Sequence, residues 1–188
     1  MASISFREIK KGHVIMLEGE PYEVLDRSFR AKQQREAMAT VNMRNLLNNK
    51  VLEKNFQSSA MVEQAMLTER RAQYLYRDGD EYAFMDQESF DQFNLTREQL
   101  KESANYLSEE LEVRIVMFEE IPIEVILPSE VVLKVIDCPP GVKGDTAQGG
   151  SKIVTLETGY KVSTPLFVEE GNMVAIKTKT GSFDRRVS

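Results

Sequence analysis

The chain has 188 residues, of which 41% are hydrophobic and 29% are charged, and its formal net charge is −6. These values are typical of a folded globular protein, and the length suits one medium domain or several small ones. No apolar run approaches the roughly 20 residues that a membrane-spanning helix needs, which excludes a membrane span of that kind. The single cysteine, Cys138, excludes an internal disulfide. Because residues 1–7 also lack the apolar core of a signal peptide, we expect a cytoplasmic protein without membrane contact.

The charge is unevenly distributed along the chain. Residues 1–64 hold ten Lys/Arg and eight Asp/Glu, a net charge of +2, and residues 128–188 hold eight and seven, a net charge of +1. Residues 65–127 hold six and fifteen, a net charge of −9. A negative total argues against nucleic acid as a partner. The acidic middle is either a face turned away from RNA or a solvated surface, and charge alone leaves both interpretations open.

The first third of the chain is typical of a small β-barrel. Glu18-Gly19-Glu20 separates two apolar segments, and glycine tolerates the positive φ that tight hairpins need. Residues 38–45 alternate between apolar and polar side chains, which indicates a strand with one buried face. Asn48-Asn49 then predicts a turn. The predicted strands are 13–17, 21–25, 37–47 and 51–56.

Residues 26–36 lie between the second and third of these strands and include four Arg/Lys among eleven residues and few apolar ones. The composition predicts a solvated hairpin tip that projects from the first barrel. Its basic residues, from Arg27 to Arg35, are candidates for phosphate contacts, and Phe29 is a candidate for stacking on a base. The alternative is a solubilising hairpin whose Phe29 folds back onto the barrel.

The middle third contains a strong hairpin signal and a short helix. Asp78-Gly79 lies between Tyr74–Tyr76 and 81–85, as expected for a tight turn between two strands. Residues 96–106 predict a helix with Thr96 as its N-cap and Glu98 or Gln99 near the capping-box position. Further strands are predicted at 113–118 and 121–127.

The last third again consists of short strands and turns. Residues 143–151 are rich in glycine and small polar side chains and predict a loop, in which Gly144, Asp145 and Thr146 offer backbone N–H groups and a hydroxyl. The alternative is a plain linker. Many short strands at close spacing indicate small barrels or sandwiches, which pack together because segments of about 60 residues bury little surface alone. The predicted strands are 131–136, 152–154, 162–164 and 173–178.

Side chains with catalytic chemistry are scarce. His13 has no sequence neighbour that would pair with it for acid–base work, and a structural role is the simpler interpretation. Cys138 lies between Asp137 and Pro139 without a thiolate-stabilising context, so a packing role is expected. No Cys/His cluster has metal-ligand spacing, and Gly149-Gly150 lacks the residues of a phosphate-binding loop. We therefore expect a binding protein that is not an enzyme, without metal or cofactor.

Several spaced motifs resemble the elongation factor P family, in the correct order and over essentially the whole chain. The C-terminal motif is the most specific, although Thr164 stands where the family usually has valine. The motifs are Gly19-Glu20-Pro21-Tyr22, Tyr74-Leu75-Tyr76-Arg77-Asp78-Gly79 with Phe84-Met85 and Phe90, Pro140–Ala147, and Lys152-Ile153-Val154 with Gly159, Val162-Ser163-Thr164-Pro165, Val168 and Gly171.

The resemblance implies an all-β protein of three small barrels in an L-shaped, tRNA-like arrangement. An SH3-like domain (1–64, with the tip loop 26–36) would be followed by two OB-folds (65–127 and 128–188). It implies a monomeric translation elongation factor whose partners are ribosomal RNA, peptidyl-tRNA and messenger RNA. The factor would bind the ribosome between the peptidyl and exit sites and stimulate peptide-bond formation at stalling sequences such as consecutive prolines.

The resemblance also implies three contact regions. The tip loop, Arg30-Ala31-Lys32-Gln33-Gln34-Arg35, would face the peptidyl-transferase centre. Gly144, Asp145 and Thr146 would lie near messenger RNA in the exit site. Arg186 matches a family arginine near the small subunit, and Phe183 stands where a tyrosine is usual.

The tip loop departs from the family pattern. The family usually has Lys-Pro-Gly-Lys-Gly there, with a second lysine, or in some branches an arginine, that is modified. That position is Gln34 when residues 29–41 are aligned without gaps, and an amide cannot undergo the chemistry used on an amine or guanidinium. Three accounts remain: a divergent paralogue that works unmodified, a shifted loop that presents Lys32 or Arg35, or a ribosome- or RNA-associated module without proline-rescue activity.

Overall fold

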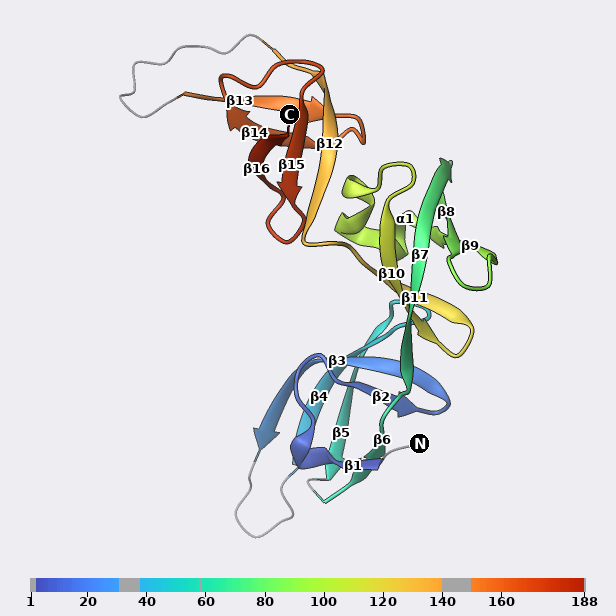
Figure 1. The fold of residues 1–188 in the computed structure, drawn as a ribbon. Helices are drawn as coiled ribbons and strands as arrows, with labels where there is room; N and C mark the ends of the chain where they lie inside the picture. The colour runs from blue at the N-terminus through green and yellow to red at the C-terminus, as the bar shows by residue number, and fades with distance from the viewer. Residues whose placement is uncertain (1–2, 31–37, 58, 140–149, 188) are drawn as a thin grey trace. The chain divides into compact units, whose positions relative to one another are not determined.

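The structure, a computed structural model, describes residues 3–30, 38–57, 59–139 and 150–187. It divides into two compact units (Figure 1): residues 1–68 with 117–123, and residues 69–116 with 124–188. The regular elements of the described residues are strands, apart from one turn of α-helix and two 3-10 segments, so the prediction of an all-β protein is confirmed. None of these helical segments is long and apolar enough to cross a membrane.

The first unit is built on a four-stranded antiparallel sheet in the order β2-β3-β4-β5, with β1 paired to β6 beside it. All four strands predicted for this part are present, and Glu18 and Gly19 both have positive φ, as a tight hairpin requires. The pairing of β1 with β6 was not predicted. The elements are β1 Ser3–Ser5, η1 Phe6–Glu8, β2 Val14–Leu17, β3 Glu20–Arg30, β4 Met38–Asn45, β5 Val51–Gln57 and β6 Met61–Glu63.

The core of the first unit lies under this sheet. Alternate side chains of β4 are buried, and the Phe6 ring stacks on Phe56 with centroids 4.9 Å apart. Phe6 reaches this place because η1 is fixed by a capping box, in which Ser5 and Glu8 satisfy each other's backbone N–H groups. The fully buried members of the core are Phe6, Ile9, Ile15, Val24, Ala39, Val41 and Met43.

The prediction of a loop over the whole of 26–36 was wrong for its first five residues. β3 continues to Arg30, and Asp26–Arg30 pair with Met38–Asn42 of β4. The strand was not predicted because most of these side chains are polar. Strand pairing uses the backbone, and an exposed face of a sheet needs no apolar residues.

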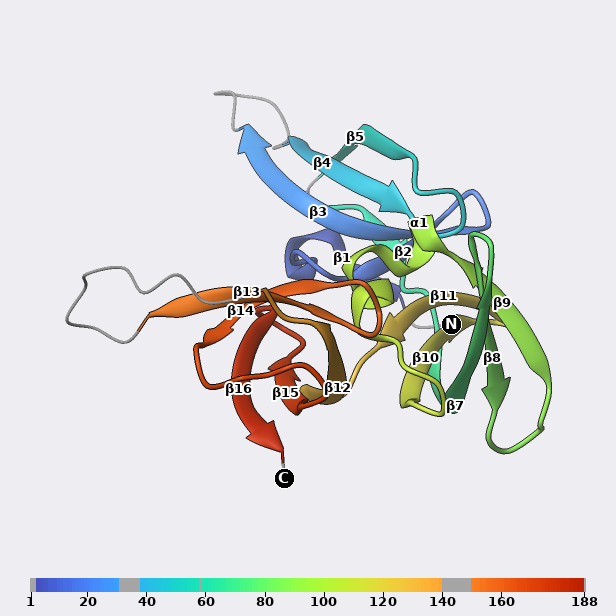
Figure 2. The ribbon, with the colours of Figure 1, turned by 90° about the horizontal axis from the view of Figure 1, so that it is seen from above.

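The second unit contains most of two five-stranded antiparallel sheets, in the orders β11-β10-β7-β8-β9 and β14-β13-β12-β15-β16. The edge strands β14 and β16 of the latter contact each other, so this sheet closes on itself (Figure 2). The elements are β7 Leu67–Asp78, β8 Glu81–Asp86, β9 Gln92–Thr96, α1 Arg97–Leu100, η2 Lys101–Tyr106, β10 Glu112–Phe118, β11 Ile121–Ile126, β12 Glu130–Asp137, β13 Ser151–Leu156, β14 Lys161–Pro165, β15 Met173–Lys177 and β16 Ser182–Val187.

The predicted helix over 96–106 is only partly α-helical. Thr96 is the N-cap and forms a capping box with Gln99, as predicted. The α-helix ends after Leu100 because Lys101 takes a φ of 52°, and the chain continues as a 3-10 segment to Tyr106. This break turns the Tyr106 ring into the core of the sheet β12–β16.

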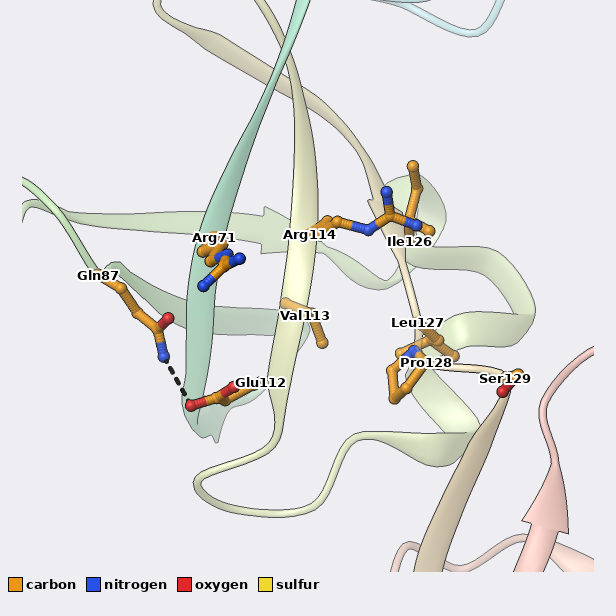
Figure 3. Close-up of a pocket in the computed structure, with 9 residues that line it drawn as sticks. All are labelled: Arg71, Gln87, Glu112, Val113, Arg114, Ile126, Leu127, Pro128 and Ser129. Carbon is orange, nitrogen blue, oxygen red and sulfur yellow. Dashed lines mark hydrogen bonds between the residues drawn. The ribbon is translucent and has the colours of Figure 1, made fainter.

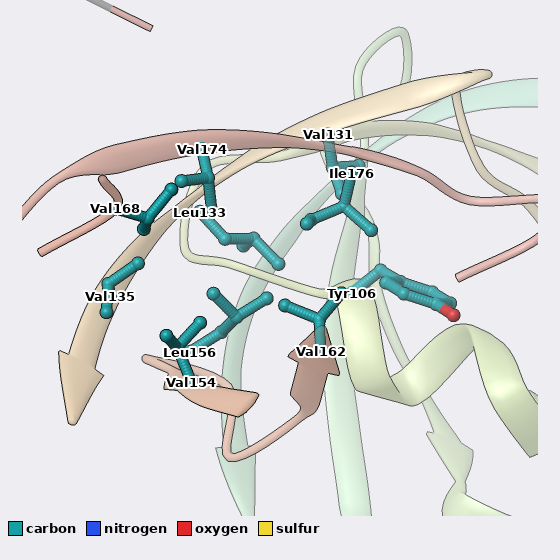
Figure 4. Packing of buried hydrophobic residues seen from close by; sticks show 10 residues of the cluster. All are labelled: Tyr106, Val131, Leu133, Val135, Val154, Leu156, Val162, Val168, Val174 and Ile176. Carbon is teal, nitrogen blue, oxygen red and sulfur yellow. The ribbon is translucent and has the colours of Figure 1, made fainter. Parts of the chain in front are cut away.

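That core is a cluster of aliphatic side chains closed by one aromatic ring. Figure 4 shows Tyr106, at the end of η2, beside side chains of β12, β14 and β15. Tyr106 is 4% exposed, and its ring meets that of Tyr160 edge-on with centroids 5.2 Å apart. The cluster consists of Tyr106, Val131, Leu133, Val135, Val154, Leu156, Val162, Val168, Val174 and Ile176.

Candidate functional site

The predicted tip loop is the connection between the two longest paired strands of the first unit. β3 and β4 pair from Tyr22 and Asn45 out to Arg30 and Met38, with a register shift between Val24 and Asp26. Arg30 is the last residue of β3. Residues 31–35, the rest of the predicted tip, lie outside the described residues.

Arg27, a predicted phosphate ligand, is hydrogen-bonded to the backbone of the first unit. Its guanidinium donates hydrogen bonds to the backbone carbonyl oxygens of Phe6 and Arg7, both at 3.1 Å. These bonds join the β3–β4 hairpin to the first two residues of η1. Arg27 therefore fixes the base of the hairpin.

The second predicted contact, Gly144, Asp145 and Thr146, lies in the connection between β12 and β13, outside the described residues. The strands that carry this connection are described, and they pair at Val135 with Leu156 and at Asp137 with Thr155. Cys138 follows β12, packs against the C-terminal core and donates from Sγ to the carbonyl oxygen of Val168 at 3.4 Å. The prediction that Cys138 has a packing role is confirmed.

The third predicted contact is fully described, and the structure adds a residue to it. Phe183 and Arg186 lie on β16, and both reach Phe167 in the β14–β15 connection. The Phe167 and Phe183 rings meet edge-on with centroids 6.5 Å apart, and the Arg186 guanidinium lies 5.7 Å from the Phe167 centroid. We call these three residues the aromatic platform. Phe167 is 57% exposed and lies next to the fully buried Val168.

Sequence reasoning missed Phe167. The signal was an aromatic residue two positions after the motif Val162–Pro165, in a segment where Val168 was already singled out. What the sequence could not indicate is that β16 folds back beside this connection. That return places Arg186, nineteen residues later, over the exposed ring.

Arg186 is the positive group of the platform, because the neighbouring basic residues are paired with carboxylates. Arg185 binds both carboxylate oxygens of Glu130, and the Lys177 ammonium lies 2.7 Å from Asp184. Lys177 and Arg185 hold the pKa of the Asp184 carboxyl below its ordinary value through hydrogen bonds and charge. No carboxylate of the described residues lies within ion-pair distance of Arg186.

An exposed ring beside an unpaired guanidinium is suited to single-stranded nucleic acid. A base can stack on the ring, and the guanidinium can meet the adjacent phosphate. The buried face of Phe183 holds the platform on the C-terminal core, so little side-chain freedom would be lost on binding. The arrangement can therefore hold a base and its phosphate.

A cavity of about 430 Å³ lies between β7, β10 and the segment that leads into β12 (Figure 3). Three of its polar side chains already have partners: Gln87 donates to Glu112 at 3.2 Å, and Arg114 lies 2.7 Å from Glu69. The lining residues are Arg71, Gln87, Glu112, Val113, Arg114, Ile126, Leu127, Pro128 and Ser129. The cavity shows no nucleophile beside a base.

Two further features bear on chemistry. The Nδ1 atom of His13 is buried, and no hydrogen-bond partner for it lies within the described ranges. Among the same residues, no group of three or more His, Cys, Asp and Glu is placed to hold a metal ion.

Comparisons with known proteins agree along the whole chain. Three family models match: the elongation factor P KOW-like domain at residues 5–62, the elongation factor P OB domain at 67–125, and the elongation factor P C-terminal domain at 131–186. They support the fold class predicted from the sequence, a small SH3-like barrel followed by OB-folds.

Curated relatives match over nearly their full length. Elongation factor P of Carboxydothermus hydrogenoformans is 44% identical over 184 residues, which covers 98% of this chain and 100% of the relative. Elongation factor P of Dictyoglomus thermophilum is 42% identical over 183 residues, covering 97% and 99%. Among solved structures, a translation initiation factor 5A from Methanococcus jannaschii has a TM-score of 0.54 at 23% identity. It covers 66% of this chain and 96% of its own, a likeness of fold.

Proposed function

The chain belongs to the elongation factor P family and is a translation elongation factor, and from that premise we propose where and how it acts on the ribosome. It binds between the peptidyl and exit sites and stimulates peptide-bond formation at stalling sequences such as consecutive prolines. The observation that carries this proposal is the match to elongation factor P relatives along the whole of both chains.

The contribution to the reaction is positional. The factor accelerates peptide transfer by holding peptidyl-tRNA in a productive geometry, which lowers the entropic part of the barrier. The β3–β4 hairpin directs Arg30, Ala31, Lys32, Gln33, Gln34 and Arg35 towards the peptidyl-transferase centre. Arg27 and η1 hold the base of that hairpin and so limit its movement.

The other contacts fix the factor on the ribosome. Gly144, Asp145 and Thr146 lie near messenger RNA in the exit site. Phe183 and Arg186 contact the small subunit, and Phe167 joins them as the exposed ring on which an RNA base stacks. The factor works as a monomer with three domains, 1–64, 65–127 and 128–188, and needs no cofactor.

At the tip we propose that the protein works without modification. Gln34 carries no amine or guanidinium for the family's modification, and the segment 31–35 still contains Lys32 and Arg35. These two side chains supply the positive charge that the tRNA backbone requires. The competing candidate, a ribosome-associated module without proline rescue, is favoured by the same substitution at position 34.

Competition with deacylated tRNA tests the proposed binding place. A factor between the peptidyl and exit sites should displace labelled deacylated tRNA from the exit site of purified ribosomes. Phe167→Ala should weaken the competition by about 5-fold to 30-fold, since stacking on one base contributes roughly 1–2 kcal/mol. Arg186→Ala should weaken it as well, and more at low salt than at high salt.

Two control variants match these changes. Val132→Ala shortens an exposed apolar side chain of the same sheet, and Lys179→Ala removes one positive charge from the β15–β16 turn. Both should compete like the wild type. Simultaneous binding of the protein and exit-site tRNA would rule out the proposed place.

A further inference from the structure

Phe90, in the β8–β9 connection, is held out into solvent. Its side chain is 69% exposed, more than Phe167 or Tyr76, and its φ is +61°. A large apolar side chain gains free energy from burial, and a residue other than glycine is strained at this φ. The fold therefore maintains two unfavourable features at one residue, which calls for a compensating role.

A buried carboxylate fixes the loop that carries Phe90. Asp86 Oδ1 accepts hydrogen bonds from the backbone N–H groups of Glu88 at 2.8 Å and Ser89 at 3.1 Å. The Asp86 carbonyl oxygen accepts from the Phe90 N–H at 3.0 Å. These bonds from Glu88 and Ser89 hold the pKa of the Asp86 carboxyl below its ordinary value, and Arg70 lies 3.7 Å away. The ring is thus presented on a preorganised turn, as anchors of protein interfaces are.

The charge around Phe90 indicates what kind of partner meets it. Glu88 and Asp91 lie within two residues of Phe90 in the sequence, and residues 65–127 carry a net charge of −9. An RNA base could stack on the ring, but its phosphates would be repelled by these carboxylates. A protein surface with an apolar pocket and a rim of lysine and arginine fits both the ring and the charge.

We propose that Phe90 anchors this protein in an apolar pocket of a basic ribosomal protein, a proposal that rests on the ribosomal function above. The acidic residues next to Phe90 in the sequence guide the basic partner, and the ring supplies most of the contact's affinity. The acidic stretch 65–127 is then an interaction surface in its own right.

Phe90→Gly gives a sharp test because glycine accommodates a φ of +61° without strain. The variant should fold at least as stably as the wild type and bind purified ribosomes about tenfold or more weakly, as expected for an interface anchor. Tyr76→Ala is the matched control: it removes another exposed ring, 53% exposed, from the same sheet, and its binding should be unchanged. Thermal unfolding of each variant confirms that the fold is intact.

Photo-crosslinking identifies the partner. With p-benzoylphenylalanine at position 90, irradiation on purified ribosomes should attach the protein to a basic ribosomal protein, identified by mass spectrometry. Crosslinking to ribosomal RNA would overturn the proposal, as would ribosome binding by Phe90→Gly at the wild-type level. In both cases the protein still binds ribosomes and the proposed function stands. A wild-type protein that did not bind ribosomes at all would overturn both.

Discussion

Tyr106→Ala is expected to destabilise the second unit by about 3–5 kcal/mol, the usual cost of deleting a buried aromatic side chain. The ring is 4% exposed and packs among aliphatic side chains of β12, β14 and β15, although Tyr106 itself belongs to η2. Its removal leaves a cavity that rigid strands on several sides cannot close. Urea unfolding, followed by circular dichroism, measures the change in the free energy of unfolding.

Tyr106→Phe is the control for the hydroxyl group. Burial raises the pKa of Tyr106 to about 12, and a hydrogen bond with Tyr160 adds to the shift. A phenol with a raised pKa stabilises the fold fully below its unfolded pKa, about 10. That stability is lost as the pH rises from about 10 through about 12. Tyr106→Phe should keep most of the stability at neutral pH and should remove this part of the alkaline sensitivity. An alanine variant as stable as the wild type would show that the ring does not belong to the core.

Gly181→Ala should destabilise the same unit by about 2–4 kcal/mol, because strain and a steric clash add together. Gly181 has a φ of +65°, and a Cβ atom there would lie 2.4 Å from the Tyr160 hydroxyl oxygen and 2.7 Å from that of Tyr106. The Tyr160 hydroxyl donates to the Gly181 carbonyl oxygen at 3.3 Å, so it cannot move away without losing that bond. Urea unfolding again gives the change.

Gly159→Ala separates the two causes. Gly159 has a φ of +84°, but no atom lies within 4 Å of the position its Cβ would take. This variant should lose only the backbone contribution, about 1–2 kcal/mol. Equal losses at positions 159 and 181 would mean that the two tyrosine hydroxyls yield freely, contrary to the packing described above.

Local signals in the sequence predicted most of the fold. The turns at 18–20 and 78–79, the N-cap at Thr96 and the alternation in β4 depend on neighbouring residues, and the structure confirms them. β1 was missed because Ser3–Ser5 pair with residues almost sixty positions later. β16 was missed because its burial does not alternate. β9 was also missed, although Phe93 and Leu95 alternate with polar residues as expected for a strand.

The candidate site depended more on contacts between distant residues. Phe183 and Arg186 came from the resemblance to the family, whereas Phe167 was identified only from the return of β16 beside the β14–β15 connection. The sequence indicated a surface cation at Arg27. In the structure its guanidinium holds the base of the hairpin, because η1 brings the carbonyl groups of Phe6 and Arg7 within hydrogen-bond distance. The role of Tyr106 likewise depends on strands that begin only at Glu130.

Translation of a reporter with three consecutive prolines, on ribosomes lacking any such factor, tests the central claim most directly. The protein is expressed in its own host, and its intact mass is recorded to show whether the tip is modified. Wild type and the variants Gln34→Ala and Lys32→Ala are compared. We predict that the wild type restores full-length product at the unmodified mass, and that the variant with the larger loss identifies the residue at the apex. Ribosome binding with the stall unrelieved would contradict the claim and leave a ribosome-associated module without proline rescue.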